Sequence, residues 1–165
     1  MAHYKATSID SRNFMLSTND VSAGTLVYSN WYSFKANIIL TNHSEYQLEP
    51  KGFWDSKIEL KRNDKLLLEF KMGWKGIVIH TKFDGEEKSY LLRLKGLLSS
   101  QYVLVDTDEK EILAVTPDFK WRKMHLDYDI ATSDEFDSQN HKELFLLAIV
   151  HCINHYLAVT SSTVA

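Results

Sequence analysis

The sequence has few of the residues that stabilise small secreted domains or bind structural metals. Cys152 is the only cysteine among the 165 residues, which excludes an internal disulfide and a thiolate cluster for zinc or iron–sulfur. The N-terminal fifteen residues contain no apolar run after a basic start, so no secretory signal is expected. We therefore expect a cytoplasmic protein, and no feature of the sequence calls for a cofactor.

A strong charge of one sign is also absent. The net charge is −3 and the pI is near 6.1, whereas nucleic-acid-binding domains usually carry a basic excess to meet the phosphates. With 44% hydrophobic and 25% charged residues, the composition predicts one globular domain over residues 1–165. No phosphate-binding loop, nucleophile elbow or HExxH sequence occurs, so we expect no enzyme and no nucleic-acid partner.

One long apolar run lies near the C-terminus. Residues Asn140–Val159 read as a helix that is apolar on nearly every side, and Asn140 with Glu143 resembles a capping pair at its start. A helix without a polar face must be enclosed by lipid or by protein. A transmembrane span needs about 20 consecutive apolar residues. Three polar residues interrupt this run: His151, Asn154 and His155. We therefore expect a helix buried in protein, not a membrane span.

The chain before this helix alternates with a period near two, which predicts strands. Twelve are expected: Tyr4–Ser8, Phe14–Ser17, Thr25–Ser29, Phe34–Thr41, Glu45–Leu48, Lys57–Lys61, Lys65–Met72, Ile77–Phe83, Lys88–Lys95, Tyr102–Asp106, Glu111–Thr116 and Trp121–Ile130. Each buries one face, and the apolar helix needs a surface on all sides. A sheet closed around the helix satisfies both needs and removes exposed strand edges. The predicted fold is mainly β: a closed antiparallel barrel of about twelve strands around a buried hydrophobic C-terminal helix.

The order of elements from about residue 45 to 159 resembles the tubby C-terminal-like superfamily, which includes the plant LURP-one-related proteins and the phospholipid scramblases. The resemblance is carried by Lys95-Gly96, Tyr102–Asp106, Glu111–Val115, Trp121, Tyr128–Ile130 and Leu144–Ile149. It implies a twelve-stranded barrel threaded by a hydrophobic helix. In tubby proteins such a barrel binds phosphoinositide head groups through basic surface residues, and scramblases act at membranes. The chain lacks the proline-rich extension and cysteine cluster of scramblases, so no scrambling activity is expected.

Two basic segments are candidate head-group ligands, because arginine and lysine bind phosphate oxygens. In the first, a strand would place Lys120 and Arg122 on one face and Trp121 and Lys123 on the other. The alternative is a solvated outer face with Trp121 in the core. The second segment flanks the Asn63-Asp64 turn and contains Lys57, Lys61, Arg62 and Lys65. The alternative there is an ordinary hairpin tip.

The polar residues of the helix allow a metal site or a structural role. His151 and His155 lie four apart on one helical face, the spacing of two zinc ligands, and strands could add His80 or His125. The alternative is a polar stripe that closes one mouth of the barrel and bonds to strand-end carbonyls. Cys152 has apolar neighbours, so we expect a buried structural cysteine and not a nucleophile.

Two acidic runs have structural explanations. Asp106, Asp108, Glu109 and Glu111 could bind calcium but lack the spacing of an EF-hand loop, so a solvated hairpin turn is expected. The second run precedes the helix, and its last members suit the electrostatic field of a helix N-terminus. It comprises Asp127, Asp129, Asp134, Glu135 and Asp137.

The leading hypothesis is a non-enzymatic binding or adaptor barrel that docks peripherally on anionic phospholipid or phosphoinositide head groups. One alternative is a carrier of small hydrophobic ligands, which requires a hollow barrel. The other is a metal-dependent enzyme that uses His151 and His155.

Overall fold

The computed structural model describes residues 1–10, 12–29, 34–52, 57–122 and 124–162. Its strands are β1 (His3–Ser8), β2 (Asn13–Thr18), β3 (Val21–Tyr28), β4 (Ala36–Leu40), β5 (Glu45–Lys51), β6 (Lys57–Arg62), β7 (Lys65–Gly73), β8 (Gly76–Thr81), β9 (Lys88–Leu94), β10 (Tyr102–Val105), β11 (Glu111–Lys120) and β12 (His125–Thr132). A short 3-10 helix, η2 (Phe83–Gly85), and two α-helices, α1 (Asp134–Asp137) and α2 (Lys142–Ser162), complete the described elements.

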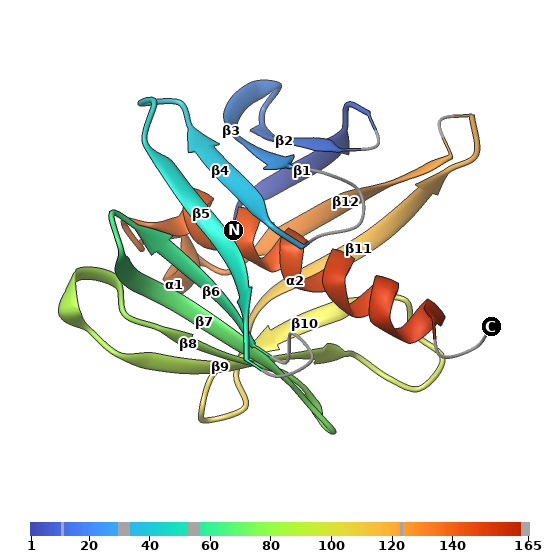
Figure 1. Cartoon of the computed structure of the whole chain (residues 1–165). Helices are drawn as coiled ribbons and strands as arrows, with labels where there is room; N and C mark the ends of the chain where they lie inside the picture. The colour runs from blue at the N-terminus through green and yellow to red at the C-terminus, as the bar shows by residue number, and fades with distance from the viewer. Residues whose placement is uncertain (11, 30–33, 53–56, 123, 163–165) are drawn as a thin grey trace.

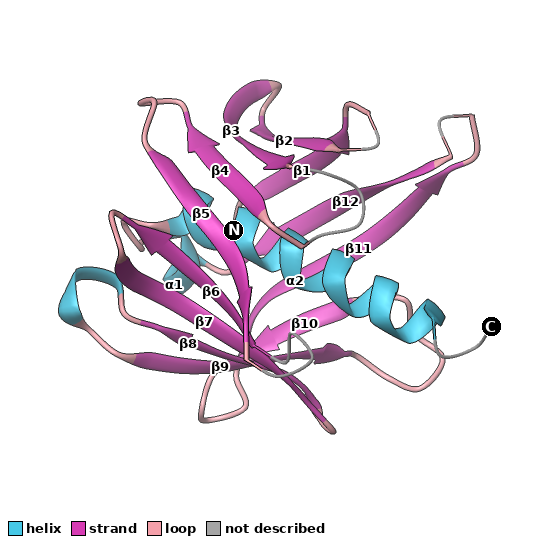
Figure 2. Ribbon diagram, in the orientation of Figure 1, coloured by secondary structure: helices cyan, strands magenta, loops and turns pink. Residues whose placement is uncertain are grey.

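The twelve strands form one closed antiparallel barrel in which every strand pairs with its neighbours in sequence, and β1 pairs with β12 to close it (Figures 1 and 2). Alternate residues point inward, as the burial of Ile58 and Leu60 on β6 and of Ile77 and Ile79 on β8 shows. The predicted fold class is confirmed. Closure leaves no free sheet edge in the described barrel.

Helix α2 fills the barrel interior. Its residues from Leu144 to Ile153 are all buried, and Gly24 of β3 shows how closely the wall approaches. A Cβ atom on Gly24 would lie 2.9 Å from Cδ1 of Leu147, so a larger residue would push the helix away from β3. The last turns, with exposed Ala158 and Val159, emerge from the barrel (Figure 1).

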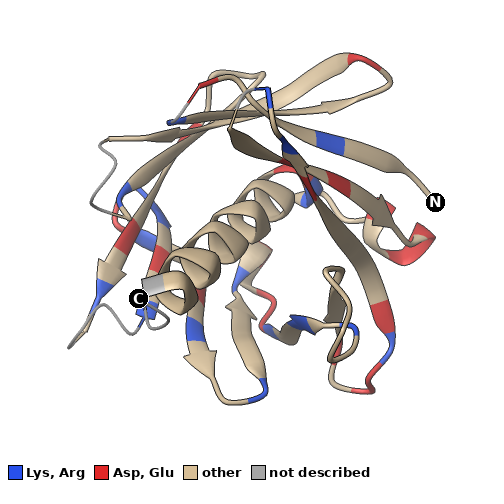
Figure 3. Ribbon diagram, turned by 90° about the vertical axis from the view of Figure 1, so that its right-hand side faces the viewer, with Lys and Arg blue, Asp and Glu red and all other residues tan. Residues whose placement is uncertain are grey.

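The two ends of the barrel are distinct because consecutive antiparallel strands place their connections at alternate ends. The described parts of the connections after β1, β3, β5, β7, β9 and β11 lie at the end of the barrel where α2 emerges, and we name this the exit end (Figure 3). The connections after the even-numbered strands form the opposite end, named the α1 end. There Phe136 of α1 is fully buried, with its ring centroid 5.7 Å from that of Phe145.

Several predicted boundaries were wrong. The strand expected from Trp121 begins instead at His125, because β11 continues to Lys120 and the chain then turns, with Met124 at φ +56°. Helix α2 begins at Lys142, since the amide of Phe145 donates to the carbonyl of His141. Asn140 is therefore not its N-cap residue.

The sequence interpretation missed helix α1. The hydroxyl of Ser133 accepts a hydrogen bond from the amide of Phe136 and caps this helix. Asp134, Glu135 and Asp137 thus lie in the first turn of α1 and not at the start of α2.

Enclosure of α2 predicts that a charge on its middle unfolds the whole domain. Leu147→Asp or Ile149→Asp would bury an unpaired carboxylate, at a cost of more than about 4 kcal/mol. We expect loss of the cooperative thermal transition measured by circular dichroism. Ala158→Asp, on the exposed end of the same helix, should melt as the wild type does. A Leu147→Asp protein with wild-type melting would contradict enclosure.

Candidate functional site

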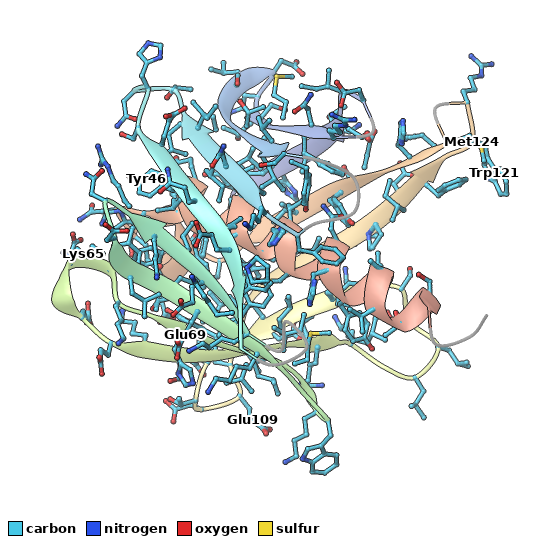
Figure 4. The ribbon with its side chains drawn as sticks, in the orientation of Figure 1. Tyr46, Lys65, Glu69, Glu109, Trp121 and Met124 are labelled. Atoms are coloured by element: carbon cyan, nitrogen blue, oxygen red, sulfur yellow. The ribbon has the colours of Figure 1, made fainter. Side chains whose placement is uncertain are left out.

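Large exposed hydrophobic side chains gather at the exit end. Ten are at least 39% exposed among the described residues, and only Met1 and Val21 belong to the α1 end. The other eight, which we name the apolar rim, are Ile9, Trp74, Leu97, Leu98, Phe119, Trp121, Met124 and Val159. Trp74 is 93% exposed and Trp121 is 79% exposed, at the tips of two separate hairpins. Figure 4 shows Trp121 and Met124 projecting beyond the barrel wall.

Charge is divided between the same two ends. The described connecting residues of the exit end contain five basic residues and one acidic residue, whereas those of the α1 end contain two basic and eleven acidic residues. The basic residues of the exit end are Arg12, Lys35, Lys75, Lys95 and Arg122, and the acidic one is Asp10. The exit end is therefore basic although the whole chain is acidic.

A crevice of about 450 Å³ opens at the exit end between Tyr156 of α2 and the walls formed by β7 to β10. Its apolar lining residues are Trp74, Ile77, Leu92, Leu94, Leu97, Tyr102 and Tyr156, and its basic ones are Lys75, Arg93 and Lys95. No acidic residue lines it. Burial raises the pKa of Tyr102 to about 12, so its hydroxyl stays protonated. The crevice thus combines an apolar floor with positive charge.

The first predicted head-group segment lies at a different part of the exit end. Lys120 forms an ion pair with Asp118, and Arg122 lies in the turn beyond. Both line a surface hollow of about 650 Å³ that also contains three carboxylates: Asp20, Asp118 and Asp127. The expectation that Trp121 enters the core was wrong. Its ring packs edge-on against Phe119 at 4.9 Å between centroids, exposed to solvent.

The second predicted segment lies on another wall, because β6 and β11 are five strands apart in the barrel. The Nζ atoms of Lys57 and Lys61 lie 3.8 Å and 3.4 Å from carboxylate oxygens of Glu59. Arg62 stacks over Tyr46, at 5.3 Å from the ring centroid. The structure therefore does not bring Lys57, Lys61 and Arg62 together with Lys120 and Arg122.

The polar residues of α2 form a buried hydrogen-bonded chain. The hydroxyl of Tyr128 donates to Oδ1 of Asn154, whose Nδ2 donates to the Tyr28 hydroxyl at 3.0 Å. The Tyr28 oxygen lies 2.8 Å from Nδ1 of His151. His155 packs edge-on against Phe34, with ring centroids 4.4 Å apart. This chain joins the helix to β3 and β12. The hydrogen bonds of Asn154 and His151 go to tyrosine hydroxyls of the wall and not to the strand-end carbonyls that the sequence interpretation expected.

Burial keeps His151 neutral. Desolvation, assisted by repulsion from His155, lowers the pKa of His151 to about 3. The Tyr28 hydroxyl accepts a hydrogen bond from Asn154, so its own proton is donated to Nδ1 of His151. Nδ1 is then the acceptor, and the proton of the neutral imidazole is on Nε2. Nε2 has no hydrogen-bond partner among the described residues.

The structure also places the residues on which the metal-dependent enzyme and the hydrophobic-ligand carrier would depend. Within the described chain, no set of three His, Cys, Asp or Glu side chains is placed to share a metal ion. His80 bonds instead to Ser89 Oγ at 2.8 Å. Cys152 is fully buried, and desolvation raises the pKa of its thiol, in line with a structural cysteine. A hollow lumen, which a lipocalin-type carrier needs, is replaced by the side chains of α2.

The acidic turn after β10 is held by hydrogen bonds between the Asp106 carboxylate and backbone amides of the turn. Oδ1 of Asp106 accepts hydrogen bonds from the amides of Asp108 at 2.9 Å and Lys110 at 3.0 Å. This is the hairpin turn expected from the sequence, with Glu109 at φ +60°.

The sequence interpretation missed the apolar rim and the crevice. The sequence did contain a signal for the basic end. In a barrel of consecutive strands, the connections after odd-numbered strands share one end and those after even-numbered strands share the other, and grouping the connections in this way separates the basic ones from the acidic ones. The crevice had no such signal, because it depends on where Tyr156 meets the strands.

Comparison of the chain with protein-family models, with curated proteins and with solved structures found no match. By length and composition, α2 could cross a membrane, but most of it is buried as the core of the barrel. The fold and the rim define a closed antiparallel barrel that has one basic and apolar end.

The neutral state of His151 predicts a pH-dependent stability. The unfolded chain binds this proton near pH 6.5, whereas the folded chain binds it near pH 3. Between these values the unfolded state holds more protons, so the free energy of unfolding should fall as the pH is lowered, by up to about 1.4 kcal/mol per pH unit. Urea denaturation from pH 7.5 to 4.5 measures this change.

Carboxylates contribute to the same pH range, so the comparison of variants is decisive. His151→Phe should show a shallower loss of stability towards acid than the wild type. His43→Asn, at an exposed turn, should retain the wild-type slope. Equal slopes for His151→Phe and the wild type would show that His151 does not contribute.

Proposed function

We propose that this protein is a non-enzymatic binding barrel that docks peripherally on an anionic phospholipid surface through its exit end. One observation carries the proposal: eight of the ten exposed large hydrophobic side chains share the end whose described connections are basic. Isolated surface hydrophobic residues need no explanation, but a gathering of them indicates an interaction site.

A bilayer suits this surface better than a folded partner does. The rim residues stand on four β-hairpins and on the last turns of α2, all at one end of the barrel. Tryptophan side chains such as Trp74 and Trp121 favour the bilayer interface, where the ring is apolar and its N–H meets water. Basic residues beside them are attracted to anionic lipids by about 1 kcal/mol each near the surface. The leaflet that faces the cytoplasm carries such lipids, and it is the surface we expect.

Membership of the tubby C-terminal-like superfamily is part of the proposal. It is supported by the order of twelve strands and then a buried helix. We propose docking through the exit end and its apolar rim, and not through a head-group site built from the sequence candidates Lys57, Lys61, Arg62, Lys120 and Arg122. Three of these cations are within 4 Å of carboxylates, whereas no described carboxylate lies that close to Lys75, Arg93 or Lys95.

Vesicle flotation tests the docking surface. The wild type should float with phosphatidylcholine vesicles that contain phosphatidylserine and much less with phosphatidylcholine alone, and added salt should weaken the binding. Trp121→Ala combined with Trp74→Ala should reduce the partition coefficient by about tenfold or more, because two interfacial side chains are lost.

Val21→Ala is the matched control, since Val21 is 65% exposed at the α1 end. It should float as the wild type does. Failure of the wild type on both kinds of vesicle would remove the lipid proposal, and equal flotation of the double tryptophan variant would remove the rim as its surface.

A further inference from the structure

The crevice at the exit end has the construction of a site for one small amphiphilic ligand. Of its apolar lining residues, Ile77 and Leu92 form a closed floor at 1% exposure, whereas Trp74 and Leu97 are 93% and 102% exposed and supply most of the open apolar surface. The rings of Tyr102 and Tyr156, which also line the crevice, lie 6.1 Å apart between centroids. Its volume of about 450 Å³ lies in the lower part of the range of small-molecule sites, which is about 300 to 1,000 Å³.

Its positive charge is not neutralised by the protein. Seven other lysines, among them Lys51, Lys82 and Lys110, lie within 4 Å of a carboxylate. No described carboxylate lies within that distance of Lys75, Arg93 or Lys95. The Nζ atom of Lys75 lies over the Trp74 ring at 5.3 Å.

The geometry points to a single-chain anionic amphiphile, such as a fatty acid or a lysophospholipid with a free phosphate, as the ligand of this crevice. Its chain would cover the apolar floor, and its carboxylate or phosphate would meet Arg93 and Lys95 at the opening. An ionic head without a chain would leave the floor empty, and a cationic head would face like charges. The crevice also lies beside the apolar rim, where such ligands enter from a membrane.

The site is distinct from a hollow barrel lumen, which α2 fills. It goes beyond the proposed docking function, because it binds one molecule in solution and needs no bilayer. The two proposals can therefore fail separately.

Isothermal titration calorimetry of the purified full chain with monomeric decanoate tests the site. We expect saturable binding of one molecule. Affinity should rise by up to about fourfold per methylene from hexanoate to decanoate, as burial of a CH₂ group predicts. Decyltrimethylammonium and inorganic phosphate are the two comparison probes, and neither should bind measurably.

Three variants locate the binding. Arg93→Gln with Lys95→Gln should weaken decanoate binding by about tenfold or more, because charge-assisted hydrogen bonds are lost. Gly96→Trp adds a large ring at a lining position where a Cβ would meet no atom within 4 Å, so it should fold as the wild type does and weaken decanoate binding. Lys65→Gln, at an exposed turn of the α1 end, should bind as the wild type does (Figure 4).

The alternative outcomes are each decisive. Equal binding of decyltrimethylammonium would show an apolar surface without selectivity for anions. Binding of inorganic phosphate as tight as that of decanoate would show an anion site without a chain pocket. No effect of Gly96→Trp would place binding elsewhere. A wild type that binds decanoate but floats with neither kind of vesicle would remove the docking proposal and leave the crevice site, and a wild type that floats but does not bind decanoate would do the reverse.

Discussion

The absence of a polar face on α2 is the constraint on which the structure depends. From Leu144 to Ile153 every residue of the helix is buried, so the chain must supply an apolar surface all around it. A single sheet layer covers one side only. Twelve short antiparallel strands closed on themselves provide that surface, and the helix in turn provides the core that the inward side chains of the strands require.

Because α2 fills the lumen, a ligand or partner can bind only at the two ends of the barrel or on its outer wall. The α1 end is acidic and contains the buried Phe136, whereas the exit end is basic, carries most of the exposed hydrophobic side chains and contains the crevice beside Tyr156. Consecutive antiparallel strands make this division possible, because alternate connections meet at one end. A chain with net charge −3 can therefore present a basic surface in one direction.

The buried polar chain from Tyr128 to His151 fixes the helix within the barrel. Without it, the apolar contacts of α2 would favour many similar rotations and depths. Hydrogen bonds to β3 and β12 select one position, and desolvation keeps the imidazole neutral there. His151, one of the two histidines spaced like zinc ligands in the sequence, thus helps to position the helix.

The fold class could be predicted from the sequence. Few folds suit period-two alternation followed by an apolar helix. The predicted strand positions were close to those observed, apart from the stretch that begins at Trp121, where β12 starts only at His125, and the short helix α1. Tertiary structure alone decided which cations act together. Lys57 and Lys120 are neutralised by carboxylates on their own walls, while Lys75 and Lys95, never selected from the sequence, meet at one crevice. The reason is physical: periodicity fixes which face a side chain occupies, but only barrel closure fixes which loops become neighbours.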